Sequence, residues 1–361
     1  MRILLLTPEL FLADGGIARI MRLYLKALCE ICGPDGRIDS LSLNDTNDAD
    51  PRVARYSNER LCHREGSHRS KWRFVIHTLK LGRQADLLVC GHLGQLAVAR
   101  LAQLFNPSLR YCLVAHGIEV WRPYTLMERW ALRGAHRILC VSDFTRRQIQ
   151  RFYPAMPAAR IVVVPNTLDP FISAEATGIA QTTTNTTENP VILSVGRLSF
   201  ADAYKGFDTL IEALPAVRHQ FPNARLRIVG DGDDLARLKA LAQAHGVSDA
   251  VEFTGRISDE ALRAEYAACT LFALPSRKEG FGLVYLEAMT HGKPCVGARA
   301  GGAPEVITEA VGQLADYGYI DDLAATLIEL LQHPPDSEVV RRHADSFAFP
   351  MFRQRLATAL R

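Results

Sequence analysis

The stretch TLFALPSRKEGFGLVYLEAMTHGKPCVGARAGGAPEVI, residues 270–307, indicates the fold most directly. Its first six residues read as a buried strand that ends on a proline. A glycine-containing bend follows, and the run after it has the composition of a helix. A strand end, a bend and a helix start therefore meet at one place. In an open parallel sheet, this is the edge at which ligands bind.

Two carboxylates bracket the bend: Glu279 precedes Gly280-Phe281-Gly282, and Glu287 lies in the opening turns of the helix. The first N–H groups of a helix lack partners within the helix and carry a partial positive charge, which suits a phosphate. Carboxylates accept hydrogen bonds from hydroxyl groups. A phosphate beside hydroxyls describes a nucleotide sugar, and we expect the segment to bind one.

Strand and helix patterns alternate along the rest of the chain. The expected strands cover residues 3–7, 87–90, 111–115, 137–141 and 161–164, and then 191–195, 226–229, 251–254, 271–274 and 294–297. Alternation of this kind is typical of parallel sheets covered by helices on both faces. We therefore expect an α/β protein with two Rossmann-like, doubly wound domains that face each other across a cleft.

The length of 361 residues also suits two domains. A polar stretch of low complexity, residues 181–190, cannot contribute to a core and indicates a linker. We expect an N-terminal domain over 1–168, a linker over 169–190 and a C-terminal domain over 191–340. Residues 341–361 are expected to hold a helix that crosses back to the first domain; an ordinary terminal helix of the second domain is the alternative.

Composition limits the classes of function. A formal charge of +3, with 48% hydrophobic and 22% charged residues, fits a soluble globular protein and gives no reason to expect nucleic-acid binding. No run approaches the roughly 20 apolar residues that cross a bilayer. Most of the eight cysteines lie in apolar patterns, as reduced and buried cysteines do. A cytoplasmic location is expected.

Positive charge gathers in residues 51–83, which hold nine Lys/Arg and two acids. Trp72, Val75, Ile76 and Leu79 fall there at helical spacing and predict a basic amphipathic helix. Its apolar stripe either packs on the core or, with residues 52–83 as a whole, contacts an anionic lipid surface or a phosphate-bearing acceptor. The second interpretation places the protein peripherally on the inner face of the cytoplasmic membrane.

Other candidates lie where strands end. Gly15 and Gly16 follow the first strand and let a ligand approach the backbone. Arg197 and Lys205 follow the strand 191–195, and two cations suit a diphosphate. His116 ends the strand 111–115, at the edge where crevice residues lie.

Other ligand classes lack their motifs. The first strand is not followed by Gly-x-Gly-x-x-Gly, and no Walker loop is present. Asp231-Gly-Asp233 and Asp48-Ala-Asp50 look like metal-binding acid pairs. We expect the first pair to cap a helix that begins near Leu235 and the second to lie in a polar loop. No metal and no cofactor are therefore expected.

Taken together, these residues resemble family 4 of the retaining glycosyltransferases, which have the GT-B fold of two Rossmann-like domains. The resemblance covers nearly the whole chain. It rests on the Glu-x7-Glu motif from Glu279 to Glu287, on residues 291–294 (HGKP) and 301–307 (GGAPEVI), and on 195–198 (VGRL), 204–206 (YKG) and 164–169 (VPNTLD). One departure is the loop 199–203, which lengthens the spacing between Arg197 and Lys205.

The resemblance implies that Arg197 and Lys205 bind the donor diphosphate, that Glu287 holds the ribose, and that Glu279 holds the 3- and 4-hydroxyls of the donor sugar. His116 is implied near the reacting centre, close to the 6-hydroxyl of the sugar. The backbone positions implied in donor binding are Gly15, Gly16, Gly280, Phe281, Gly282, Leu283 and Val284, with Arg256 and Ile257 at the base.

The function implied is retaining, metal-independent transfer of a hexose-type sugar from a nucleoside diphosphate donor, the co-substrate, to a hydroxyl acceptor. The acceptor is expected to be a lipid-linked glycan or a polysaccharide or lipopolysaccharide precursor. Two alternatives stay open: a nucleotide-sugar 2-epimerase and a non-catalytic nucleotide-sugar-binding subunit. The sequence does not identify the donor base, the sugar, the acceptor or the oligomeric state.

Overall fold

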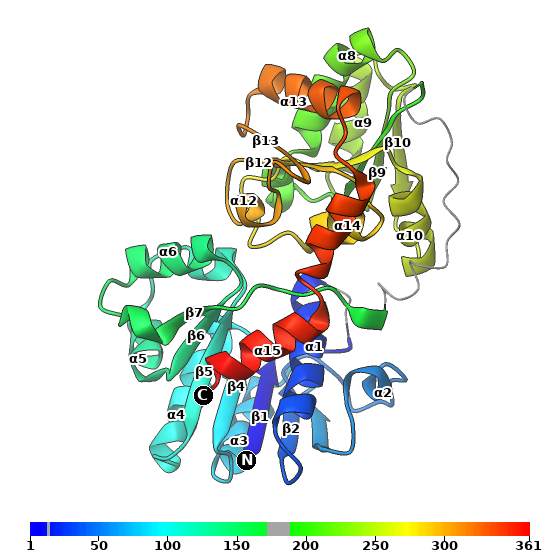
Figure 1. The fold of residues 1–361 in the computed structure, drawn as a ribbon. Coiled ribbons are helices and arrows are strands. Elements are labelled where there is room, and N and C mark those ends of the chain that lie inside the picture. Colours follow the sequence, from blue (N-terminus) through cyan, green and yellow to red (C-terminus); the bar gives the residue numbers. More distant parts are fainter. Residues whose placement is uncertain (13–14, 172–187) are drawn as a thin grey trace. The chain divides into compact units, whose positions relative to one another are not determined.

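The computed structural model describes residues 1–12, 15–171 and 188–361, which form two compact units. The first unit contains Met1–Thr167 and Phe349–Arg361, and the second contains Leu168–Ala348 (Figure 1). Much of the expected linker, at 172–187, lies outside the described residues. Within the described part of the chain, no helix is long and apolar enough to cross a membrane.

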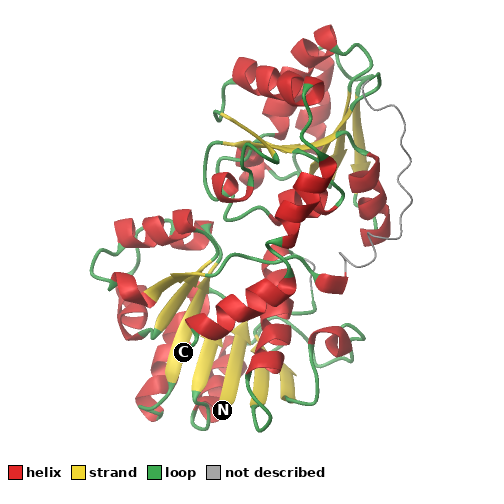
Figure 2. Cartoon of the chain, viewed as in Figure 1, coloured by secondary structure: helices red, strands yellow, loops and turns green. Residues whose placement is uncertain are grey.

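The first unit is built on a sheet of seven parallel strands in the order β3-β2-β1-β4-β5-β6-β7. Figure 2 shows the strands in yellow and the helices that cover them in red. The central strands are continuous apolar runs because helices cover both of their faces. The strands are β1 (Arg2–Thr7), β2 (Arg37–Ser42), β3 (Leu61–Gly66), β4 (Leu87–Cys90), β5 (Arg110–Ala115), β6 (Arg137–Cys140) and β7 (Ile161–Val163).

Helices cover this sheet on both sides. One face carries α3 (Lys71–Gly82), α4 (Leu96–Phe105), α5 (Leu126–Gly134) and α6 (Asp143–Phe152), whose buried side chains share one core with the sheet. The short helix α2 (Val53–Tyr56) contacts α1 (Gly16–Ile31).

The last helix, α15 (Phe349–Ala359), belongs to the first unit although 181 residues of the second unit precede it in the chain from Leu168 to Ala348. It packs against α1 (Figure 1), where the rings of Tyr24 and Phe352 meet edge to face at 5.0 Å. Arg353 pairs with Glu30 at 2.7 Å. Aromatic packing and an ion pair thus fasten the end of the chain to the first unit.

The second unit holds six parallel strands in the order β10-β9-β8-β11-β12-β13. The strands are β8 (Val191–Val195), β9 (Arg225–Val229), β10 (Val251–Gly255), β11 (Leu271–Leu274), β12 (Cys295–Ala298) and β13 (Gly312–Ala315). The helices are α8 (Phe207–Gln220), α9 (Leu235–Ala244), α10 (Asp259–Ala268), α11 (Leu283–Thr290), α12 (Ala303–Val306), α13 (Ile320–Gln332) and α14 (Ser337–Asp345).

Three strands differ from the sequence expectation: β2, β3 and β13 were not expected. Strand β2 has the sequence RIDSLS, whose polar residues interrupt the apolar pattern expected of a buried strand. The buried Asp39 forms an ion pair with Arg2 at 2.8 Å. Strand β3 lies at the sheet edge and is largely polar. Both strands form because neighbouring backbone pairs with them, which local sequence patterns do not show.

Helix α3 forms where the basic amphipathic helix was expected, but its buried side is different. Phe74 and Thr78 are buried, and Leu79 packs against the core. Trp72 and Ile76, which the apolar stripe included, are exposed. The expectation that the whole stripe packs on the core is therefore wrong for these two residues.

Candidate functional site

The predicted donor-binding residues of the second unit gather at the carboxyl edge of its sheet. Arg256 and Ile257 follow β10, Arg197 follows β8, and Glu279 follows β11. In a parallel sheet, the carboxyl ends of all strands lie at one edge. The strand order β10-β9-β8-β11 therefore sets these residues in a row, with Arg256 and Ile257 at the sheet edge and Arg197 next to the strand of Glu279.

A tight backbone contact fixes the bend that carries Glu279. The N–H of Gly302 donates to the Glu279 carbonyl at 2.7 Å. A Cβ on Gly301 would lie 2.5 Å from that carbonyl oxygen, and one on Gly302 would lie 2.4 Å from the Gly280 carbonyl oxygen. Gly301 and Gly302 are thus glycines because the bend packs directly on their backbone. This gives the GGAPEVI segment a structural role in the site.

The carboxylate of Glu279 sits in an environment that disfavours its charge. Burial raises its pKa above the usual value, while the cation of Lys205 and the N–H groups of Gly280 and Phe281 lower it in part. A half-buried carboxylate with a raised pKa at a strand end is a common feature of functional sites. The arrangement leaves Glu279 suited to accept hydrogen bonds from ligand hydroxyls.

Helix α11 presents its N-terminus beside Glu279. Its N-cap is Gly282 at φ +95°, no side chain caps it, and its first turn holds no acid. Tyr285 anchors the helix by donating a 2.6 Å hydrogen bond to the Leu274 carbonyl at the end of β11. A helix start without a side-chain cap, held rigidly against the sheet, suits an anion.

Glu287 lies one turn into α11 and is positioned by a residue that the sequence analysis missed. The hydroxyl of Tyr266, on α10, donates to Glu287 Oε2 at 3.0 Å. Tyr266 is buried and stacks on His291 with a ring distance of 6.0 Å. Tyr266 is 21 positions away in sequence, so no local pattern links the two residues.

The lengthened loop 199–203 supplies a partner for Arg197. The Arg197 Nε donates to Asp202 Oδ2 at 2.6 Å, and the Tyr204 hydroxyl donates to Asp202 Oδ1 at 3.0 Å. Burial raises the pKa of Asp202, but these two hydrogen bonds and the nearby cations lower it overall. Arg197 itself stays 72% exposed. Asp202 therefore holds the guanidinium without covering it.

Lys205 is carried by the turn that closes the same loop. Gly206 has φ +79°, and a Cβ there would lie 2.7 Å from the Pro275 carbonyl. The N–H of Arg277 donates to the Tyr204 carbonyl at 2.9 Å. The turn is thus fastened to the end of β11, which brings Lys205 close enough to lower the pKa of Glu279. The structure therefore brings Arg197, Lys205 and Glu279 together.

The first unit holds His116, Gly15 and Gly16 at the carboxyl edge of its own sheet. The His116 Nε2–H donates to the Gly91 carbonyl at 2.9 Å, and the His116 N–H donates to Glu119 at 2.6 Å. Burial lowers the pKa of the ring, and Glu119 opposes this shift. The neutral ring therefore has Nδ1 available in the role of acceptor. A Cβ on Gly15 or Gly16 would meet nothing within 4 Å, so packing does not explain these glycines.

Three of the four acids considered as metal ligands have other partners. Asp231 accepts from the Gly232 N–H, and Asp233 accepts from the Phe200 N–H. The expected capping by these two residues is wrong, because α9 begins after Asp234. Asp50 pairs with Arg52 at 2.8 Å. No group of three or more His, Cys, Asp or Glu among the described residues is arranged to hold a metal ion.

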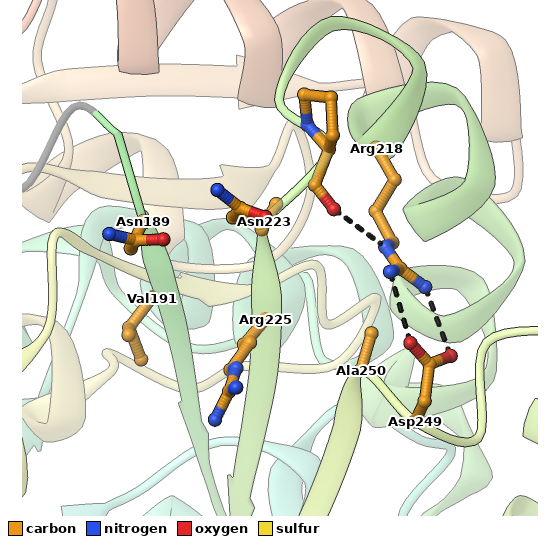
Figure 3. A pocket seen from close by; sticks show the side chains of 9 residues that line it. Asn189, Val191, Arg218, Asn223, Arg225, Asp249 and Ala250 are labelled. Carbon is orange, nitrogen blue, oxygen red and sulfur yellow. Dashed lines mark hydrogen bonds and ion pairs between the residues drawn. The ribbon is translucent and has the colours of Figure 1, made fainter.

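A pocket of about 390 Å³ lies at the opposite edge of the second sheet, at the amino ends of β8, β9 and β10 (Figure 3). Arg218 lines it and forms two 3.0 Å hydrogen bonds with Asp249. None of the predicted site residues lines this pocket. The chemistry is therefore expected at the carboxyl edge.

The fold and the motif define a glycosyltransferase with the GT-B fold. Residues 176–346 match the model of Glycosyl transferases group 1, and residues 33–170 match that of Glycosyltransferase Family 4. The chain belongs to family 4 of the glycosyltransferases.

Similar proteins are known from several organisms. The chain is 34% identical over 275 residues to the GDP-mannose-dependent alpha-(1-6)-phosphatidylinositol monomannoside mannosyltransferase of Mycolicibacterium smegmatis, a match covering 72% of this chain and 68% of the relative. It is 34% identical over 164 residues to the sulfoquinovosyl transferase SQD2 of Arabidopsis thaliana, covering 44% and 29%.

Two solved structures share the fold. Alr3699/HepE of Anabaena in complex with UDP matches with a TM-score of 0.78 at 22% identity, covering 100% of this chain and 99% of that chain. The lipopolysaccharide outer core galactosyltransferase WaaB matches with a TM-score of 0.76 at 20% identity and the same coverage.

Replacing Asp202 by Asn is expected to lower the rate of sugar transfer about tenfold, because a charge-assisted hydrogen bond to Arg197 is lost. In the background of Arg197→Ala, the same change should have little further effect. Steady-state rates of the four proteins in a double-mutant cycle measure this coupling. Asp249→Asn, which breaks an ion pair at the other edge of the sheet, is the matched control. Additive losses from Asp202 and Arg197 would show that Asp202 does not act through Arg197.

Proposed function

We propose that the protein transfers a hexose-type sugar from a nucleoside diphosphate donor to a hydroxyl of a lipid-linked or other glycan acceptor, with retention and without a metal ion. One observation carries the proposal. Glu279 and Glu287 flank a helix start that no side chain caps, and two cations from the neighbouring loop lie at the same sheet edge. Anion-binding and hydroxyl-binding groups thus alternate along one edge.

The donor is assigned to this edge group by group. Arg197, Lys205 and the N–H groups of Leu283 and Val284 take the diphosphate. Glu287, oriented by Tyr266, accepts from the ribose hydroxyls. These assignments follow the order of the groups on α11, in which the phosphate-binding N-terminus precedes Glu287 by one turn.

The sugar and the base of the donor are assigned to residues on either side of the diphosphate and the ribose. Glu279 accepts from the hydroxyls of the sugar, and the backbone at Arg256 and Ile257, after β10, meets the base. We assign His116 to the 6-hydroxyl of the sugar, the role that the resemblance to the family implies. A neutral imidazole with Nδ1 as acceptor suits that role, and Gly15 and Gly16 leave room for a ligand at the backbone.

Catalysis in this proposal is electrostatic. The bond between C1 of the sugar and the diphosphate oxygen breaks, and its electron pair leaves with the diphosphate. The two cations and the helix N–H groups stabilise that developing charge. The acceptor oxygen bonds to C1 on the face that the diphosphate leaves, and its proton passes to the leaving phosphate. Glu279 is engaged by backbone N–H groups and sugar hydroxyls, so it is not assigned as a nucleophile.

The relatives suggest which substrates to test first. The Mycolicibacterium relative is a GDP-mannose-dependent mannosyltransferase named for phosphatidylinositol monomannoside. Two structures of Alr3699/HepE hold UDP alone and UDP with glucose. We therefore propose GDP-mannose, followed by UDP-hexoses, as donors and a glycolipid as the acceptor class. A thermal-shift screen of these donors identifies the one that binds, because a ligand of the folded state raises the unfolding temperature.

With the donor identified, Arg197→Ala is expected to lower kcat about a hundredfold, because one charge that stabilises the leaving diphosphate is lost. Arg218→Ala, at the opposite sheet edge, is the matched control and should keep its rate. NMR of the wild-type product should show the anomeric configuration of the donor. Near-wild-type transfer by Arg197→Ala contradicts the site, and an inverted product contradicts the mechanism.

Glu279→Gln is expected to abolish most transfer and yet to stabilise the free protein at pH 7–8. Burial raises the Glu279 pKa in the folded state, so the charged form costs folding free energy above the unfolded pKa of about 4.3. The advantage of the Gln variant should therefore shrink as the pH falls toward that value. Thermal unfolding of both proteins at several pH values measures it. A Gln variant that is less stable at every pH would show that Glu279 stabilises the fold.

A further inference from the structure

Helix α3 exposes large apolar side chains although it packs on the core with its other side. Trp72 is 80% exposed and Ile76 is 59% exposed. The two residues are one turn apart and therefore lie on the same side of the helix. Phe74 and Thr78 make the contact with the core instead. Large apolar side chains that are exposed next to each other indicate an interaction surface.

A second exposed apolar group lies at the start of α5. Leu126 is 85% exposed and Met127 is 60% exposed, and Trp130 follows one turn later, also exposed. The buried side of this helix is formed by Ala131 and Leu132. Arg100 of α4 lies over the Trp130 ring at 5.5 Å, so Trp130 is only partly exposed, at 37%, whereas Leu126 and Met127 are more fully exposed.

The topology brings the two groups to the same face of the first unit. Helices α3, α4 and α5 cover one face of the sheet, and α4 packs against both of the others. Helix α3 begins at the carboxyl edge of the sheet, whereas α5 follows a longer connection in which Tyr124 packs against Tyr153 at the end of α6. Both apolar groups lie in the opening turns of their helices. They therefore lie on the two sides of α4, on one face of the first unit.

The same surface is strongly basic. Residues 67–135 contain ten Lys/Arg and three Asp/Glu. All three acids have partners within the fold: Asp86 accepts from the Arg2 N–H, Glu119 from the His116 N–H, and Glu128 pairs with Arg122. Neither α3 nor α4 contains an acid. The exposed bases of α3 and α5 are Lys71, Arg73, Lys80, Arg129 and Arg133.

We propose that this surface binds the face of a lipid bilayer that contains anionic lipids. The α3–α5 surface is defined by Trp72, Ile76, Leu126, Met127 and Trp130 together with Lys71, Arg73 and Arg129. Tryptophan side chains favour the boundary between lipid chains and headgroups. Lysine and arginine next to apolar side chains give the pattern of helices that lie on an anionic membrane.

The charge pattern favours a membrane over a protein partner or a second copy of the chain. Charged residues are depleted at the centre of protein interfaces. Here Lys71 and Arg73 directly flank Trp72, and Arg129 adjoins Trp130. Two copies placed face to face would also bring like charges together. An anionic bilayer, in contrast, matches both the apolar side chains and the basic residues beside them.

The proposed membrane contact covers a smaller part of residues 52–83 than the sequence suggested, and it also includes α5. Arg52 pairs with Asp50 and stacks on Phe11, which Arg64 also contacts. Arg60 donates to the Gly33 carbonyl. These bases are engaged within the fold. The segment around Trp72 remains available, and α5 joins it although it lies outside 52–83.

Co-sedimentation of the full chain with phosphatidylcholine vesicles, with and without phosphatidylglycerol, tests the proposal. Binding is expected only with phosphatidylglycerol. Trp72→Ser with Ile76→Ser, and separately Lys71→Glu with Arg73→Glu, should each weaken it about tenfold or more. Matched controls in the second unit are Tyr319→Ser, an exposed aromatic, and Lys239→Glu with Arg342→Glu, which changes the net charge equally.

Equal binding to both vesicle types, no binding by the wild type, or wild-type binding by the double variants would each overturn the proposal. Light scattering provides a further check. If the wild type self-associates and Trp72→Ser with Ile76→Ser abolishes that, while vesicle binding is unchanged, the surface is an interface between copies. Thermal-shift binding of a nucleoside diphosphate, measured on the same variants, shows that they are folded and reports the donor site separately from the membrane surface.

Discussion

The contact between the bend at Glu279 and the glycine pair Gly301-Gly302 is the constraint on which the donor site depends. Three backbone features meet there: the 2.7 Å hydrogen bond from Gly302 to Glu279, and two approaches that no Cβ would allow. They fix the bend against the end of β12. The bend in turn sets both the carboxylate of Glu279 and the start of α11. The spacing between the groups proposed to bind hydroxyls and those proposed to bind phosphates is therefore a property of the backbone.

The charges of the site are arranged around this rigid bend at some cost to stability. Burial works against the ionised form of Glu279, whereas hydrogen bonds from Arg197 and Tyr204 keep the buried Asp202 ionised. Such environments persist where binding or catalysis requires them. The lengthened loop 199–203 shows how this chain meets the requirement: it provides its own anchor for a guanidinium that stays open to a ligand.

Much of this could be predicted from the sequence, because the strands around the site are continuous apolar runs and the site residues follow them directly. The parts that were missed depend on contacts across the fold. Strands β2 and β3 are polar and form by pairing with β1 and with each other. Tyr266 reaches Glu287 from another helix. Helical spacing identified Trp72 and Ile76 as apolar but could not show which side of α3 the core covers.

Calorimetric titration of the nucleoside diphosphate and of the intact donor sugar, into the wild type, Glu287→Gln and Glu279→Gln, tests the central claim most directly. If the two glutamates divide the donor, Glu287→Gln weakens binding of both ligands, about tenfold or more. Glu279→Gln should weaken binding of the donor sugar alone and leave the diphosphate unchanged. Equal effects of the two substitutions on both ligands would contradict the assignment of Glu287 to the ribose and Glu279 to the sugar.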